Sequence, residues 1–137
     1  GAPVGSMLVG SEAFVDEARR VRKLFGGGMR QAGVLGAAGL YALENVDRLA
    51  TDHEHAQLLA AGLDDLSGIT VEQPETNIVV ADVTGTGMTE DEFAAACTDA
   101  GVQCSGFGGG RVRLCTHLDV TREDVDDAID VVAAVVD

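Results

Sequence analysis

The sequence predicts a small α/β domain in its second half, in which helices pack on one face of a sheet. The first observation is the order of patterns: two short β-branched runs, a helix start, two further runs and a second helix start. The second is an apolar fraction of 46%, which suits a folded core and excludes a disordered acidic chain. This interleaving favours a two-layer sandwich, whose start we place near residues 67–69.

The first 28 residues contain one predicted strand and one predicted helix. Residues 4–9, VGSMLV, are apolar and bounded by glycines, as expected of a short buried strand. Ser11 can cap a helix over residues 11–24, whose apolar face consists of Phe14, Val15, Ala18, Val21 and Leu24. Three consecutive glycines at 26–28 then end this helix.

The following segment, from Met29 to about Leu66, is predicted to be helical because it has no proline and carries regularly spaced leucines. We expect the helix to start at Met29–Arg30. The segment forms either one long helix or two helices with a bend near Glu44–Asn45.

The second half is predicted to contain four strands and two helices. Residues 68–73, 76–83, 101–105 and 111–117 are the strands, and the glycine-rich GFGGG separates the last two. Thr89 with Glu92 has the pattern of a capping box, which opens a helix through Ala100. Thr121 with Asp124 opens the final helix, whose buried stripe consists of Val125, Ile129 and Val132.

The chain is strongly acidic, since 23 Asp and Glu residues oppose eight Arg and a single Lys, Lys23, for a formal net charge of −14. Binding to nucleic acid needs basic residues against phosphates or aromatic platforms against bases, and aromatic residues make up only 4%. We therefore exclude nucleic acid as a partner. Salt at about 1 M shortens the Debye length to about 3 Å and removes the repulsion on such a surface, so the acidity predicts a halophilic source.

The cysteines and the length of the apolar runs indicate in which cellular compartment the protein is found. The three cysteines, Cys97, Cys104 and Cys115, form no CxxC pair. We therefore expect no structural disulfide and no zinc site, and this favours a cytoplasmic location. No apolar run approaches the roughly 18 residues of a membrane helix. The start, GAPVGSMLVG, lacks an initiator Met and a signal-peptide pattern, so we expect the chain to be part of a longer protein.

The glycine turn in RKLFGGGMRQAG has two interpretations. Backbone N–H groups at a helix start, with Arg30 beside them, can bind an anion. Alternatively, the turn is a flexible link, and Arg22 and Lys23 are ordinary charges at the end of a helix.

The segment RVRLCTHLDV also has two interpretations. On a strand, Arg111, Arg113 and Cys115 face one way, so the two arginines can clamp a carboxylate. Alternatively, they pair with acidic residues of the last helix on a solvated edge strand. His53 and His55 are two apart on a helix, so we expect exposed residues that share no metal, and we expect His117 to be structural.

Several blocks together resemble the C-terminal part of low-specificity L-threonine aldolases, which are fold-type I pyridoxal-phosphate enzymes. The resemblance covers essentially the whole chain and is carried by GAPVGSMLVG, RKLFGGGMRQAGVLGAAGLYALE, RLATDHEHA, ETNIV and VRLCTHLDVTREDVDDA. It implies the end of a large domain at 1–28, a linking helical segment at 29–67 and a small C-terminal α/β domain at 68–137. It also implies a homotetramer with active sites at subunit boundaries.

The resemblance implies a lyase that cleaves L-threonine or related β-hydroxy-α-amino acids to glycine and an aldehyde. Arg113 would bind the substrate carboxylate, with support from Asn77. Arg30, with Lys23 near it, would lie by the active site or the cofactor phosphate and reach in from a neighbouring subunit. Arg111 is expected to have a structural role. The catalytic lysine that holds the cofactor lies upstream in the family, so this chain alone is expected to be inactive.

The alternative from another class is a catalytically empty small α/β module. Such a module would bind an acidic metabolite or a partner chain. The residues that would separate the two hypotheses are those of the upstream lysine segment, which the 137 residues do not contain.

Overall fold

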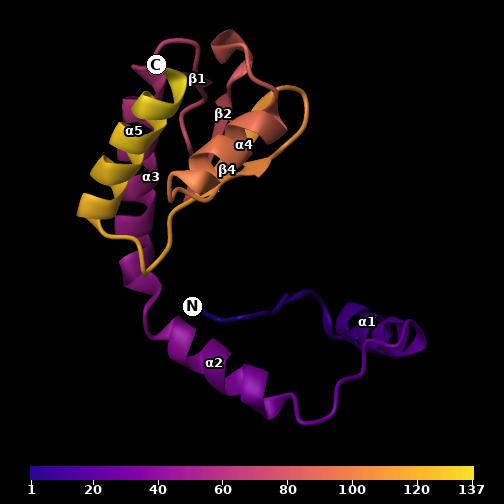
Figure 1. Cartoon of the computed structure of the whole chain (residues 1–137). Coiled ribbons are helices and arrows are strands. Elements are labelled where there is room, and N and C mark those ends of the chain that lie inside the picture. The colour runs from indigo at the N-terminus through magenta and orange to yellow at the C-terminus, as the bar shows by residue number, and fades with distance from the viewer. The chain divides into compact units, whose positions relative to one another are not determined.

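The computed structural model describes all residues, 1–137, and divides into two compact units, Gly1–Val46 and Asp47–Asp137. Each unit is described by itself, and Figure 1 labels the elements of both. None of the helices combines the length and the apolar character needed to cross a bilayer. The division between the units falls within the predicted linking segment, 29–67.

The first unit contains two helices, α1 (Glu12–Leu24) and α2 (Gly33–Leu43). The prediction for α1 is confirmed, because the Ser11 hydroxyl accepts a hydrogen bond from the Phe14 amide at 3.4 Å. The strand predicted at residues 4–9 is wrong: this segment has no strand pairing. An apolar run forms a strand only where a neighbouring backbone supplies the ladder hydrogen bonds.

The helix after the glycines starts later than predicted. Met29 and Arg30 are not helical, and α2 begins at Gly33. Gln31 causes the delay because its φ of 55° lies in the left-handed region, which an α-helix cannot include. A break near Glu44–Asn45 is confirmed: α2 ends at Leu43, a short 3₁₀ helix η1 follows at Val46–Arg48, and α3 begins after it.

A four-stranded antiparallel sheet organises the second unit. Its strands are β1 (Thr70–Val71), β2 (Ile78–Asp82), β3 (Ser105–Gly106) and β4 (Arg111–Cys115), in the spatial order β1-β2-β4-β3. The predicted sequence of elements is confirmed, but β1 and β3 are only two residues long. The central pairing places Val80 opposite Arg113.

Three helices, α3 (Leu49–Asp64), α4 (Glu90–Asp99) and α5 (Arg122–Val136), form the second layer of this unit (Figure 1). The predicted capping box is present at Thr89–Glu92, and the predicted helix start at Thr121 also forms a capping box, with Asp124. A short 3₁₀ helix, η2 (Thr84–Thr86), links β2 to α4. The core includes Leu63, Val79, Phe93, Val112, Leu114, Val125 and Val132.

Alternation along β4 separates the two faces of the sheet. Val112 and Leu114 are buried against the helices, whereas Arg111, Arg113 and Cys115 are exposed, as predicted. The final helix buries Val125 and Val132, and Ile129 is partly buried against them, which confirms the predicted stripe.

The turn after α3 depends on two glycines in close contact. Gly68 has a φ of +83°, and a Cβ added there would lie 2.6 Å from the carbonyl carbon of Gly85. In the reverse direction, a Cβ on Gly85 would lie 2.8 Å from the Cα of Gly68. The turn that leads into β1 therefore lies directly on η2, with no space for a side chain between them.

All buried residues belong to the second unit. The helices of the first unit bury none of their residues, and large apolar side chains such as Met7, Phe25 and Tyr41 are exposed. The first unit therefore has no hydrophobic core of its own.

Candidate functional site

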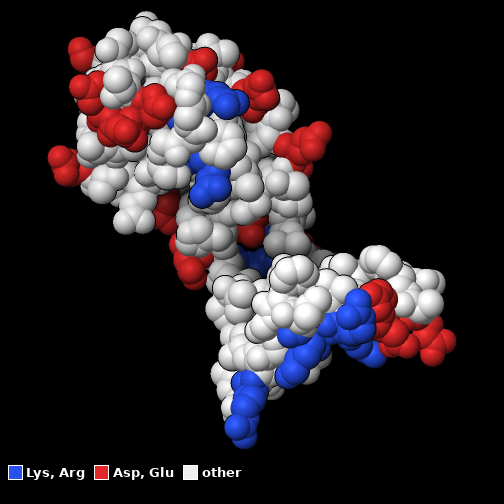
Figure 2. Space-filling view, turned by 90° about the vertical axis from the view of Figure 1, so that its right-hand side faces the viewer, with Lys and Arg blue, Asp and Glu red and all other residues white.

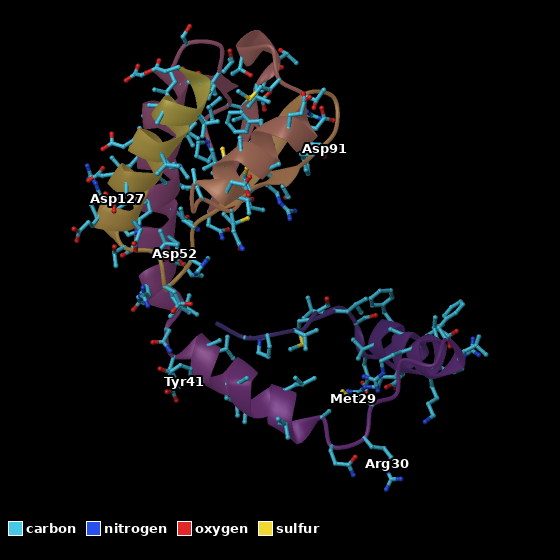
Figure 3. The ribbon with its side chains drawn as sticks, viewed as in Figure 1. Met29, Arg30, Tyr41, Asp52, Asp91 and Asp127 are labelled. Atoms are coloured by element: carbon cyan, nitrogen blue, oxygen red, sulfur yellow. The ribbon has the colours of Figure 1, made fainter.

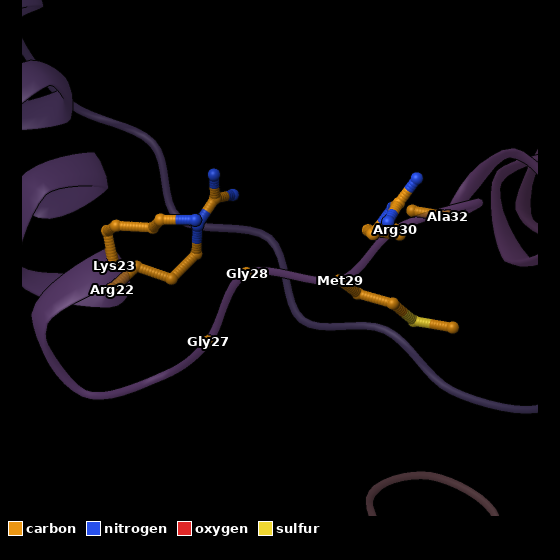
Figure 4. A pocket seen from close by; sticks show the side chains of 7 residues that line it. All are labelled: Arg22, Lys23, Gly27, Gly28, Met29, Arg30 and Ala32. Carbon is orange, nitrogen blue, oxygen red and sulfur yellow. The ribbon is translucent and has the colours of Figure 1, made fainter.

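A basic hollow of about 430 Å³ lies in the first unit, where α1 ends and the glycine turn begins (Figure 4). Gly26 has a φ of +77°, and the Gly27 amide donates to the Arg22 carbonyl at 2.8 Å, so the chain folds back on the helix end. The basic hollow is lined by Arg22, Lys23, Gly27, Gly28, Met29, Arg30 and Ala32.

The side chains around the basic hollow carry unpaired positive charge. Arg19 and Arg20 form ion pairs with Asp16 and Glu17 one helical turn away. By contrast, Arg22, Lys23 and Arg30 have no carboxylate within ion-pair distance, although the whole chain carries −14. Figure 2 shows several basic side chains close together on the first unit, with acidic ones beside them at one end, and further acidic side chains spread over the second unit.

A Cβ added at Gly28 would lie 3.2 Å from the nitrogen of the Lys23 ammonium. Because glycine has no Cβ, the ammonium lies close to the backbone of the turn. Two guanidinium groups and one ammonium beside a glycine backbone form a donor set that suits a phosphate. The structure thus brings the predicted residues Lys23 and Arg30 together, and it adds Arg22, which the sequence analysis explained as an ordinary helix-end charge.

A second hollow, of about 420 Å³, lies in the second unit and is called the Arg113 hollow. It is lined by Thr98, Gln103, Cys104, Ser105, Arg113, Cys115 and His117. Arg113 is exposed on β4 and has no carboxylate within ion-pair distance, so the alternative of pairing with the last helix does not apply to it. A free guanidinium in an open hollow can bind a carboxylate through two parallel hydrogen bonds.

Arg111, two residues earlier on the same face, is held by the loop between β3 and β4. Its Nε donates to the Gly108 carbonyl at 3.2 Å, and its guanidinium carbon lies 5.3 Å from the centroid of the Phe107 ring. Arg111 is absent from the lining of the Arg113 hollow. This placement supports the structural role expected for Arg111.

Asn77 acts on the backbone at the end of β4. The side-chain NH2 of Asn77 donates to the Thr116 backbone carbonyl at 2.8 Å. The backbone carbonyl of Asn77 accepts a hydrogen bond from the Thr116 backbone amide at 3.0 Å. The Thr116 hydroxyl in turn donates to the Asp52 carbonyl of α3 at 2.6 Å. Asn77 is therefore three residues from Arg113 in strand register and does not line the hollow.

The histidines differ from expectation in two respects. His53 and His55 are half-buried rather than exposed, and they lie at the start of α3, where the Thr116 hydroxyl donates to the Asp52 carbonyl. On the first turns of α3, the Asp52 Oδ1 and His55 Nδ1 atoms are buried without a hydrogen-bond partner. Figure 3 labels Asp52 on this helix.

Of the residues that line the Arg113 hollow, the sequence analysis assigned only Arg113 to a site. Cys115 and His117 follow Arg113 by two and four residues, so strand alternation, which already placed Cys115 on the face of Arg113, could also have indicated His117. The His117 Nδ1 accepts a hydrogen bond from the Asp119 amide at 3.3 Å. No group of three His, Cys, Asp or Glu side chains is arranged to hold a metal ion.

Comparison with known proteins gives the family. The model of the beta-eliminating lyase family matches residues 1–86. The chain belongs to the beta-eliminating lyase family.

The matched relatives are threonine aldolases. The chain is 43% identical over 129 residues to low-specificity L-threonine aldolase 1 of Arabidopsis thaliana, covering 91% of this chain and 36% of the relative. It is 42% identical over 132 residues to the low specificity L-threonine aldolase of Escherichia coli K12, with coverages of 91% and 36%. The predicted resemblance is confirmed, and the chain spans about 36% of the length of these relatives.

A solved structure supports the fold class. The aspartate aminotransferase of Rhizobium meliloti matches with a TM-score of 0.61 at 18% identity, over 75% of this chain and 30% of that chain. At this identity the similarity is one of fold. It confirms the predicted α/β class, a portion of the fold-type I architecture.

Proposed function

We propose that this chain forms part of a pyridoxal-phosphate-dependent lyase that cleaves L-threonine or related β-hydroxy-α-amino acids to glycine and an aldehyde. The relatives named above carry threonine aldolase in their names. The single structural observation behind the proposal is Arg113, an unpaired guanidinium in a hollow on the exposed face of β4.

In this proposal Arg113 binds the α-carboxylate of the amino acid. A guanidinium accepts the planar carboxylate in one orientation through two parallel hydrogen bonds. Holding the carboxylate fixes the rotation about the bond to the α-carbon, and so determines which bond at that carbon can be broken. Asn77 is a positioning residue, because it holds the backbone of Thr116 at the end of the strand that carries Arg113.

The basic hollow suits the phosphate group of the cofactor. Arg22, Lys23 and Arg30 supply three cations without carboxylate partners, and Gly27 and Gly28 keep the backbone accessible. Pyridoxal phosphate, when bound, supplies an electron-withdrawing ring that stabilises the electron pair left when the carbon–carbon bond breaks. The residues of this chain hold the phosphate end and the substrate carboxylate.

The chain by itself is proposed to be inactive. Lys23 is the single lysine, and it lies in the basic hollow, where it serves a phosphate rather than a covalent link to the cofactor. The complete enzyme is proposed to be a cytoplasmic homotetramer from a halophilic source. The second class of function, a small module that binds an acidic metabolite or a partner chain, becomes the better description if the natural polypeptide does not bind the cofactor.

The first experiment uses the longest natural polypeptide that contains this sequence. Pyridoxal phosphate is added, and the visible absorption of the bound cofactor is recorded before and after L-threonine, together with release of acetaldehyde. A cofactor band that shifts with substrate, and acetaldehyde formation, support the lyase. A polypeptide that binds no cofactor and releases no aldehyde would overturn the proposal.

The second experiment tests Arg113 in that polypeptide. Arg113→Ala removes charge-assisted hydrogen bonds worth about 1.5–3 kcal/mol, which corresponds to a rise in KM for the amino acid of about 10- to 150-fold. The matched control is Arg122→Ala, since the Arg122 guanidinium pairs with Asp126 on the exposed surface of α5. Equal KM values for the Arg113 and Arg122 variants would remove Arg113 from the site.

A further inference from the structure

Two of the three cysteines are brought together by the turn between α4 and β3. Cys97 lies in α4 and is completely buried, whereas Cys104 precedes β3 and is half-buried. The chain reverses between them, because Gly101 has a φ of +100° and the Val102 amide donates to the Cys97 carbonyl at 2.8 Å. Cys104 packs against the buried core cluster that contains Cys97.

The two thiols differ in access. Cys104 lines the Arg113 hollow and so is open to small reagents, while Cys97 lies behind it in the core. The interaction with Cys104 and, after it, burial raise the pKa of Cys97, whereas the Cys97 thiol, as a donor, lowers the pKa of Cys104. The accessible thiol is therefore the one that more readily forms the nucleophilic thiolate.

Cys115 provides an internal comparison. It lines the same hollow and is exposed, but it lies on the outer face of β4, whereas Cys104 packs partly against the core. Cys115 thus shares the hollow with Cys104 but not the packing against the core cluster that contains Cys97.

We propose that Cys104 and Cys97 form a peroxide-reactive pair, in which Cys104 is oxidised first and Cys97 then closes an intramolecular disulfide. The Cys104 thiolate attacks one oxygen of hydrogen peroxide, so that an S–O bond forms, the O–O bond breaks and hydroxide leaves. The Cys97 sulfur, on losing its proton, then attacks the Cys104 sulfur, and the S–S bond replaces the S–O bond as water leaves. The two thiols lose two electrons, and the peroxide gains them.

Oxidation of this pair changes the Arg113 hollow. Thr98 and Gln103, the neighbours of the two cysteines inside the turn, both line that hollow. A disulfide holds its two sulfurs closer than two thiols in contact, so we expect the side chains beside the two cysteines to shift when the bond forms. The pair therefore links the redox state of the protein to the shape of the hollow. This inference does not depend on the proposed function, because its readout is the state of the thiols.

The experiment uses the full natural polypeptide, reduced and then exposed to hydrogen peroxide at low protein concentration. Remaining thiols are alkylated, and the digest is analysed by mass spectrometry. We expect the peptides carrying Cys97 and Cys104 to become linked, with loss of alkylation at both residues together, while Cys115 remains alkylated. In Cys115→Ser the same link forms.

Variants of the pair separate the two steps. In Cys97→Ser, Cys104 is expected to be trapped as the sulfenic acid by dimedone, and in Cys104→Ser, Cys97 is expected to remain a reduced thiol. Cys97 is buried, so Cys97→Ser can disturb folding. In that case the proposal is tested by comparing the unmodified protein with Cys104→Ser, in which the replaced residue is only half-buried. A link between Cys104 and Cys115, a link only between separate molecules, or equal oxidation of Cys97 in Cys104→Ser would overturn the proposal.

Discussion

Replacing Gly68 by alanine should destabilise the second unit strongly, for two separable reasons. Gly68 has a φ of +83°, and an L-residue in this region loses about 1–2 kcal/mol. The added Cβ would also lie 2.6 Å from the carbonyl carbon of Gly85 and 2.8 Å from the Thr86 amide nitrogen. Both are backbone atoms, so η2 must move, and such overpacking costs about 1–3 kcal/mol more.

Two other glycines isolate these terms. Gly87 has nearly the same φ, +81°, but nothing lies within 4 Å of an added Cβ, so Gly87→Ala tests the backbone strain alone. Gly85→Ala tests the close contact, since its Cβ would lie 2.8 Å from the Gly68 Cα without a left-handed φ. Each Gly→Ala substitution also lowers the conformational entropy of the unfolded chain. This effect is the same in all three variants, so it cancels when their free energies of unfolding are compared.

The assay is urea unfolding followed by far-ultraviolet circular dichroism. We expect losses of about 2–5 kcal/mol for Gly68→Ala, about 1–2 for Gly87→Ala and about 1–3 for Gly85→Ala, with unchanged slopes. If Gly68→Ala costs no more than Gly87→Ala, or if Gly85→Ala is neutral, the contact between the two turns does not constrain the fold.

Three further predictions concern the core, the helix caps and the basic hollow. Phe93, which is 2% exposed, is the largest fully buried side chain, so Phe93→Ala should cost about 3–5 kcal/mol in thermal or urea unfolding, whereas the half-exposed Phe107→Ala should cost much less. The pKa of Glu92 is lowered by hydrogen bonds from the Thr89 amide and hydroxyl, and that of Asp124 by those from the Thr121 hydroxyl and amide. Since the folded pKa values lie below the unfolded ones, this stabilisation is complete above the ordinary values of 4.5 and 3.8 and is lost as the pH falls through the folded values. In the double variant Thr89→Ala/Thr121→Ala, the free energy of unfolding should therefore fall less steeply as the pH is lowered. An unchanged pH dependence would contradict the role given to the two capping threonines. Arg22→Ala, Lys23→Ala and Arg30→Ala should each weaken binding of inorganic phosphate by isothermal titration calorimetry in low salt, whereas Arg20→Ala, whose guanidinium pairs with Glu17, should not.

Local chemistry explains the parts of the fold that the sequence predicted well. The capping boxes at Thr89 and Thr121 depend on residues three apart, so their pattern is complete within one helical turn. The alternation in β4 likewise predicted which face Arg113 occupies, and hence its place in an open hollow. The role of Arg113 in binding a carboxylate stays a prediction.

The errors concern features that distant segments decide. His53 and His55 are half-buried in a part of α3 that is hydrogen-bonded, through Asp52, to Thr116, 64 residues further along the chain. Residues 4–9 have the composition of a strand, but no neighbouring backbone pairs with them. The late start of α2 depends on a left-handed Gln31, a conformation that is uncommon for this residue type and has no simple pattern.

The lengths of the outer strands have a consequence for behaviour at high protein concentration. β1 and β3 flank the sheet and contain two residues each, whereas the five-residue strands β2 and β4 are paired on both sides. A long free strand edge is a template on which another chain can add a strand and begin a fibril. Here each border offers too few free backbone groups for such growth. Any self-association of this protein should therefore involve side-chain surfaces and should not produce the cross-β signature in thioflavin fluorescence or fibre diffraction.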